Sequence, residues 1–187
     1  MKKTMMIMVL ILMIICSSGL SFAQNKLSAD DLLSKAQNFL ASKFNMTFRY
    51  PIRVSFVAGV ELDKILGDSP YKGGEVGLYK FTGGVNQVYL LKDYNYDLTY
   101  GCLCHELTHA WQKENCPNQS LTLKEGLAKW IEYKALYYDR AYTYANQINQ
   151  YLADPVYGVG YRFIQKLEDK YGEAKVLSVV KGLKDIQ

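Results

Sequence analysis

The sequence has no run of basic residues, no glycine-rich phosphate loop, no internal repeat and no long low-complexity stretch. Without a phosphate loop, the common nucleotide-binding motifs are excluded. The formal net charge is +4, or +2 without Lys2 and Lys3, and the latter value is too mild to indicate a nucleic-acid or anionic partner. The length suffices for one domain with a hydrophobic core. We therefore expect a single globular domain without a nucleic-acid partner.

Long apolar runs are also lacking, apart from residues 5–16, which are too few for a comfortable membrane span. Two lysines precede this run, and Ser21-Phe22-Ala23 follows it with small residues at the positions that signal peptidase reads. We expect cleavage after Ala23 and a secreted or periplasmic domain of residues 24–187 without a stable membrane anchor. An uncleaved anchor is the alternative.

Cysteine is sparse, and its spacing does not favour disulfides. Cys102 and Cys104 lie two residues apart on a predicted helix, so they point to different sides. Cys116 lies about 18 Å further along that helix, whereas a disulfide needs Cα atoms within about 7 Å. We predict no disulfide among these three, and buried free thiols at Cys102 and Cys104.

Histidine is the scarcest of the reactive residues, and the two copies lie in His105-Glu106-Leu107-Thr108-His109. Residues four apart on a helix share one face, so His105 and His109 can hold one metal ion. Glu106 lies about 100° further round the axis, beside the metal, where it can take a proton from water. The motif predicts a zinc site with Glu106 as general base. A chance match on an amphipathic helix is the alternative for so short a motif.

The helix that carries this motif is predicted to run to about Asn115. Pro117 then removes a backbone donor, and Ser120 is a suitable N-cap for the next helix. The two helices therefore form an antiparallel αα-hairpin.

A catalytic zinc ion usually takes three protein ligands, and no third histidine exists. At about 1.5 Å per residue, His109 lies roughly 9 Å before the turn and Glu125 roughly 7.5 Å after it. Glu132, roughly 18 Å from the turn, is level with His105. We predict His105, His109 and Glu125 as zinc ligands, and Glu132 as the partner of the other ring nitrogen of His105.

With these residues the chain resembles the gluzincin metallopeptidases, in which two histidines and a glutamate bind zinc. The segment Glu125–Glu132 is similar to the E-G-x-A-x-aromatic-x-E segment of the aminopeptidase N group. The wider pattern resembles the peptidase domain of plant LIM-domain growth regulators over roughly residues 74–172. That pattern comprises His105–Trp111, Glu125-Gly126, Pro155–Arg162 and Lys170–Gly172.

The resemblance implies a zinc peptidase with a small sheet before the metal helix and one edge strand that holds an extended substrate. The chain departs from the plant proteins because it has no LIM module and no ubiquitin-binding segment. It also has Lys129 where the thermolysin branch of gluzincins has an acidic residue.

The remaining elements are read from periodicity and turn residues. We predict a helix from Ser28 to about Phe44 and a hairpin turn at Gly83-Gly84. Three strands and a short helix are expected before the metal helix, and further helices after it. The strands are 52–58, 74–81 and 86–91, the short helix is 61–66, and the later helices are 133–138 (continuing the ligand helix), 140–152, 161–171 and 173–183.

Tyr157 lies in a glycine-rich stretch, residues 155–160, that we expect to separate two helices. Peptide hydrolysis develops an oxyanion, which a phenol beside zinc can stabilise, so Tyr157 is a candidate catalytic residue. The alternative is that the glycines serve tight helix packing and the tyrosines belong to the core. The 16 tyrosines in the chain fit amphipathic packing, and a tyrosine-lined substrate groove is secondary.

The sequence thus predicts an α+β, mostly helical, zincin-like domain with a small antiparallel sheet. We expect a monomeric, secreted Zn²⁺ peptidase acting on a peptide or protein, in which zinc lowers the pKa of water toward about 7 and Glu106 moves the proton. The rival is a non-enzymatic zinc-fold binding protein with an occluded cleft. A third interpretation, hydrolysis of a cell-wall peptide, keeps the same chemistry.

Overall fold

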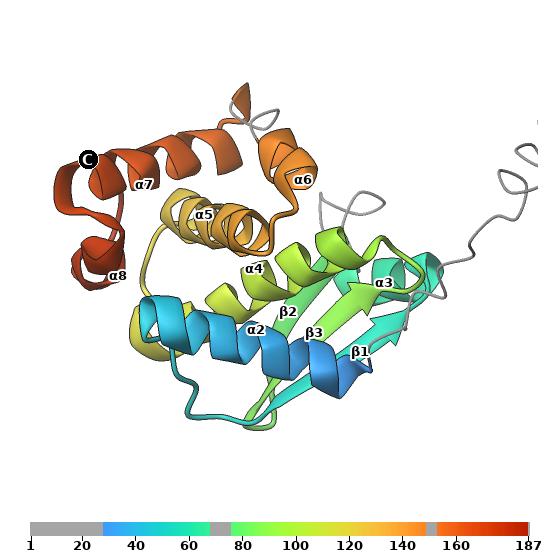
Figure 1. The fold of residues 1–187 in the computed structure, drawn as a ribbon. Helices are drawn as coiled ribbons and strands as arrows, with labels where there is room; N and C mark the ends of the chain where they lie inside the picture. Colours follow the sequence, from blue (N-terminus) through green and yellow to red (C-terminus); the bar gives the residue numbers. More distant parts are fainter. Residues whose placement is uncertain (1–27, 68–75, 149–152, 187) are drawn as a thin grey trace, which may run out of the picture.

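The computed structural model describes residues 28–67, 76–148 and 153–186, so the expected signal peptide lies outside the described residues. A three-stranded sheet, a layer of two helices and then the helices that come last in the chain follow one another in space (Figure 1). Within these ranges, no helix combines the length and apolar character needed to cross a membrane. The predicted α+β, mostly helical class is confirmed.

Helix α2, Ala29–Phe44, lies against β1 and α4. It begins where the sequence predicts, because Ser28 accepts from the backbone N–H of Asp31 while the Asp31 carboxylate accepts from the Ser28 backbone N–H. It ends at Asn45, whose φ of 52° is left-handed. The helix supplies the buried side chains of Leu32, Ala36, Leu40 and Phe44 to the core.

The sheet contains β1 (Ile52–Val57), β2 (Gly77–Thr82) and β3 (Val85–Leu91) in the order β1-β3-β2. The predicted β2–β3 hairpin is confirmed, and Gly83 and Gly84 have the positive φ values, 59° and 76°, that its turn requires. The sheet is nevertheless mixed and not wholly antiparallel, because β1 pairs in parallel with β3. Helix α3 (Gly59–Leu66) and β2 separate these strands along the chain, which gives the long connection that parallel neighbours need.

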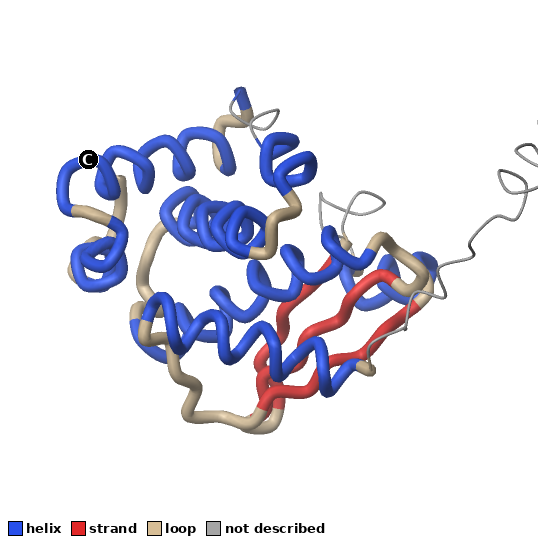
Figure 2. The backbone as a smooth tube through the Cα atoms, viewed as in Figure 1, coloured by secondary structure: helices blue, strands red, loops and turns tan. Residues whose placement is uncertain are grey.

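Helices α4 (Tyr96–Asn115) and α5 (Leu121–Tyr138) form the predicted hairpin. Ser120 caps α5 by accepting from the backbone N–H of Leu123. Helix α4 packs against β2 and β3, and α5 packs on α4 away from the sheet (Figure 2). The pair is antiparallel, since His105 meets Glu132 whereas Gln112, further along α4, meets Lys124, which comes earlier in α5.

The C-terminal helices are α6 (Tyr142–Gln147), α7 (Tyr157–Tyr171) and α8 (Glu173–Lys181). The expected helix over 140–152 is shorter, because Arg140 has a φ of 63°, and residues 149–152 lie outside the described part. The expected glycine-rich break is wrong in part: α7 already begins at Tyr157, whose backbone N–H donates to the Asp154 carboxylate at 2.7 Å.

Two glycines let α7 lie directly on α5. A Cβ atom on Gly126 would lie 2.3 Å from the backbone carbon of Gly160, and one on Gly160 would lie 2.1 Å from the carbonyl oxygen of Thr122. No side chain fits between the two backbones at this crossing. Packing of α7 therefore fixes the part of α5 that carries Glu125.

Candidate metal and catalytic site

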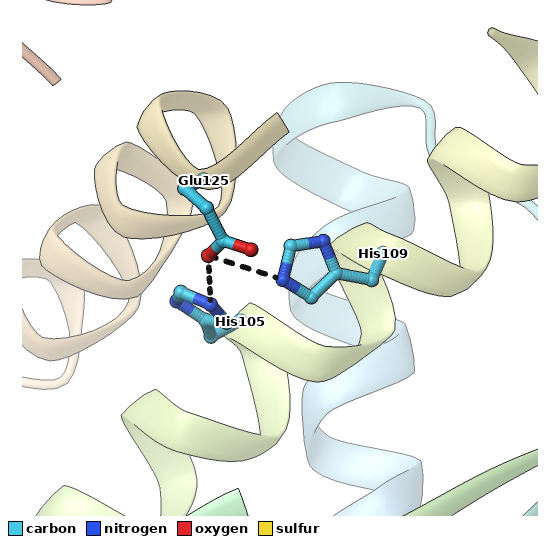
Figure 3. A group of neighbouring side chains, drawn as sticks. All are labelled: His105, His109 and Glu125. Atoms are coloured by element: carbon cyan, nitrogen blue, oxygen red, sulfur yellow. Dashed lines mark ion pairs between the residues drawn. The ribbon is translucent and has the colours of Figure 1, made fainter. Parts of the chain in front are cut away.

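His105 and His109 project from one face of α4 toward Glu125 of α5 (Figure 3). The Nε2 atom of His105 lies 3.3 Å from Glu125 Oε2, and that of His109 lies 3.5 Å from the same oxygen. The side chains are 10–15% exposed, so the three donors converge in a largely buried position. The predicted set of residues is brought together, and it is a group that could hold a metal ion.

The outer nitrogen of each histidine has a partner that leaves Nε2 facing Glu125. His105 Nδ1 lies 3.1 Å from Glu132 Oε2, in agreement with the predicted pairing. His109 Nδ1 lies 2.9 Å from Gln112 Oε1, whose Nε2 donates to the carbonyl of Lys124 at 3.0 Å. Both partners can accept from Nδ1, which leaves the Nε2 lone pair of a neutral ring available to a metal ion.

Gln112 is a site residue that the sequence reasoning missed. It lies three residues after His109, which places it on the same helix face, and it is almost fully buried. Its spacing from His109 is the signal that the sequence offers, whereas its burial depends on the packing of α5.

The separations of the Glu125 oxygen from the two imidazole nitrogens fit a tetrahedral metal. With bonds of about 2.0–2.1 Å to zinc, neighbouring ligand atoms are about 3.3–3.4 Å apart. The two separations from Glu125 Oε2 are 3.3 and 3.5 Å. Two imidazoles and one carboxylate also match the ligand types of catalytic zinc sites, which leave a fourth position open.

Glutamates outnumber lysines at the site. Glu106, Glu125 and Glu132 lie close to the two histidines and to Lys129, whose Nζ lies 2.6 Å from Glu132 Oε2. A metal ion binds imidazole in its neutral form, so with the ion in place the three carboxylates and Lys129 would leave an excess of negative charge that a divalent cation would cancel. The residues present therefore fit a bound dication by charge as well as by geometry.

Burial and the contacts between these side chains shift their pKa values. Burial lowers the pKa of His105, but its contacts with Glu125 and Glu132 raise it to about 10. Burial opposes ionisation of Glu132, yet Lys129 and His105 hold its pKa at about 2. The histidines likewise hold the pKa of Glu125 well below its usual range despite burial. Both glutamates are thus carboxylates at neutral pH.

Glu106 is buried beside the three donors, and burial raises its pKa above the usual range. Nearby Glu125 and Glu132 also raise it, whereas the histidines lower it. A glutamate with a raised pKa is better matched to proton transfer near neutral pH. Gly77 makes room for it, because a Cβ there would lie 3.2 Å from Glu106 Cγ and 2.5 Å from Cys102 Sγ.

Two cavities meet at Glu106. Both are lined by Gly77, His105, Glu106 and Tyr157. Cavity A, about 240 Å³, extends past Lys129 and Glu132 toward the aromatic rings of Tyr94 and Tyr144. Cavity B, about 380 Å³, extends past His109 and Gln112 toward Lys113 and Lys124. The structure therefore brings Tyr157 to the site, at the start of α7.

Strand β2 forms the edge of the sheet that borders these cavities, which the sequence left undecided. Leu91 N–H donates to the carbonyl of Val76 at 2.8 Å. Backbone groups alternate in an antiparallel ladder, so Gly77, Tyr79 and Phe81 direct theirs away from β3. Gly77 lines both cavities and Tyr79 lines cavity B. An extended chain could therefore pair with this edge beside Glu106.

The cysteines of the described residues are free, as predicted. Cys104 and Cys116 are buried, and burial raises the pKa of the Cys116 thiol to about 11. Cys102 is only half-buried, in contrast to the prediction, because its helix face borders cavity A.

Comparison with known proteins gives one family. The family model described as "Peptidase of plants and bacteria" matches residues 82–186, which is more than half of the chain. The matched segment contains α4, α5 and α7, the helices that carry the converging side chains. No curated protein and no solved structure matches the chain.

Proposed function

Because the chain belongs to the family of peptidases of plants and bacteria, we propose that it is a zinc-dependent peptidase of the gluzincin type. The observation that carries the proposal is the convergence of His105 Nε2, His109 Nε2 and Glu125 Oε2 within 4.8 Å of one another. These residues would hold the ion. A bound zinc ion would act as a Lewis acid that lowers the pKa of a water molecule at the site and polarises the substrate carbonyl.

Glu106 acts as the general base. It takes a proton from water as the water oxygen attacks the peptide carbonyl carbon, and it returns the proton to the amine when the C–N bond breaks. Its buried position, its raised pKa and its place where cavities A and B meet support this role.

Glu132 and Gln112 act as positioning residues. Each accepts a hydrogen bond from the Nδ1 of one histidine and fixes the ring that would bind the metal. Lys129 in turn holds the Glu132 carboxylate at 2.6 Å.

Tyr157 and β2 act on the substrate. Tyr157 lines both cavities, where its hydroxyl can donate to the oxyanion that develops on the carbonyl oxygen. The outward backbone groups of Gly77 and Tyr79 can pair with an extended peptide as an added strand.

The test is the Glu106→Gln variant. Glutamine keeps the shape and one acceptor oxygen but takes no proton at neutral pH, so we expect a rate lower by about 10²–10⁴ with zinc content unchanged. Tyr157→Phe removes a donor and no base, so its loss should be smaller. The measurement is turnover of a library peptide that the wild type cleaves, with zinc content assayed in parallel. Wild-type turnover by zinc-loaded Glu106→Gln would refute the mechanism.

A non-enzymatic zinc-fold binding protein is the rival, and it predicts an occluded cleft. Two cavities that open at Glu106 favour the enzyme. Zinc binding without cleavage of any library peptide would favour the rival.

We also propose export with cleavage after Ala23, on the order of charged, apolar and small residues at the N-terminus. N-terminal sequencing of the exported protein should begin at Gln24. Retention of residues 5–16 in a membrane fraction would contradict it.

A further inference from the structure

Cavity B is lined by two lysines, one from each helix of the α4–α5 hairpin. Lys113 lies four residues after His109, on the same face of α4, and Lys124 directly precedes Glu125 on α5. Lys124 Nζ donates to the carbonyl of Pro117 at 2.8 Å. Among the described residues, neither lysine has a carboxylate within ion-pair distance. Lys113 Nζ lies 5.9 Å from the ring centroid of Phe81. Neither contact neutralises the charge, so both ammonium groups can attract a charged ligand.

The acidic residues near these lysines are engaged elsewhere. Glu125 faces both histidines, and Glu106 is the proposed base. Glu114 follows Lys113 in sequence but turns toward the sheet, where it accepts from Arg49 N–H at 2.8 Å and from Asn86 Nδ2 at 3.1 Å. A dication at the site would balance Glu106 and Glu125, which leaves the positive charge of cavity B uncompensated.

Cavity A has the opposite character. Its cation, Lys129, lies 2.6 Å from Glu132 and 5.7 Å from the ring centroid of Tyr157. The wall beyond it is aromatic, with Tyr94 and Tyr144. The positive charge in cavity A is thus already matched by a carboxylate of the protein, whereas that in cavity B is not.

We propose that cavity B is a substrate subsite for a carboxylate, bound by Lys113 and Lys124. This inference rests on the proposed peptidase function, which supplies a peptide beside β2. The carboxylate can come from an aspartate or glutamate side chain or from the C-terminus of the peptide. Two lysines also disfavour a free α-amino group in this cavity, since like charges repel.

Binding to zinc-loaded Glu106→Gln tests the subsite without turnover. The probes are dansyl-labelled alanine octapeptide amides that carry one Glu at each position in turn, each matched by a Gln peptide. An all-alanine octapeptide with a free C-terminal carboxylate is matched by its amide. Fluorescence anisotropy should show one carboxylate form binding about three- to tenfold more tightly than its neutral match. The difference should shrink as salt is raised.

Lys113→Gln/Lys124→Gln, in the same Glu106→Gln background, should abolish this preference. The matched control is Lys166→Gln/Lys175→Gln, which removes two exposed lysines of α7 and α8 and should keep it. A preference for internal Glu identifies a side-chain carboxylate, and a preference for the free C-terminus identifies the terminal one. Equal binding of charged and neutral probes, or a preference that survives in the cavity B variant, overturns the subsite.

Turnover by the wild type separates the two proposals. If peptides are cleaved but neutral and acidic probes bind alike, the subsite is wrong and the peptidase stands. If acidic probes bind through the lysines but no library peptide is cleaved, the peptidase is wrong and the anion-binding cavity stands.

Discussion

The His105 end and the His109 end of the site differ in how they use charge. At His105, a carboxylate from α5 accepts from the ring, and Lys129 neutralises that carboxylate. At His109, a neutral amide of the same helix does this work, and it is itself held by a backbone carbonyl of α5. At the His105 end, the charges of Lys129 and Glu132 neutralise each other. Near the His109 end, the charges of Lys113 and Lys124 face cavity B. In the proposed site, both ends would hold the metal, and the His109 end would also recognise substrate.

The largest loss of zinc affinity should come from removing Glu125, the carboxylate that both histidines face. Glu125→Ala deletes the carboxylate that lies 3.3 Å from His105 and 3.5 Å from His109, and two imidazoles rarely hold catalytic zinc alone. We expect zinc affinity to fall well beyond the roughly 10–100-fold loss typical of an outer partner. Metal analysis after dialysis against a weak chelator measures it. Equal zinc retention in the variant and the wild type would remove Glu125 from the ligand set.

The next effect should come from the charged end. Glu132→Gln keeps an acceptor for His105 but removes the charge that Lys129 neutralises at 2.6 Å. We expect zinc affinity to fall by about 10–100-fold, because the ring loses the carboxylate that raises its basicity. Competition with a chromogenic chelator gives the affinity.

Lys129→Met is the control for the charged end, since it removes the cation and keeps the carboxylate on His105. We expect it to weaken zinc binding less than Glu132→Gln does. If the two variants lose affinity equally, Glu132 acts through its ion pair with Lys129 and not through His105.

The smallest effect should come from the neutral end. Gln112→Met keeps the length of the side chain but removes the acceptor for His109 and the donor to Lys124. A neutral amide contributes less to ring basicity than a carboxylate, so we expect about a tenfold loss of zinc affinity, at the lower limit for an outer partner. The same chelator competition measures it. A loss larger than that of Glu132→Gln would reverse the comparison.

The two ends also differ in how far the sequence predicted them. Glu132 follows from depth along an antiparallel helix pair, which needs only the rise per residue and the position of the turn. Gln112 lies on the same helix as His109, but an amide one turn away is common on exposed helix faces and carries no distinctive pattern. Its burial and its bond to Lys124 depend on the second helix, so they were not readable in advance.

A similar limit explains the errors in the fold. The glycines of residues 155–160 were expected to interrupt a helix, because glycine weakens isolated helices. Gly160 lies within α7 because it meets Gly126 backbone to backbone, a contact between segments distant in sequence. The parallel pairing of β1 with β3 likewise depends on where α3 and β2 carry the chain, and strand periodicity is the same in either pairing.

Local rules in the sequence determined the helix that carries both histidines and the Ser120 cap of the next helix. They also determined that His105 and His109 share one face, and that Glu125 lies about as far from the turn as His109 does. These follow from the helix period and from capping chemistry, which act over a few residues. Only the tertiary structure decided that β2 borders the site, that Tyr157 reaches it, and that Lys113 and Lys124 share one cavity. Each depends on close packing between distant segments, where no side-chain period specifies which surfaces meet.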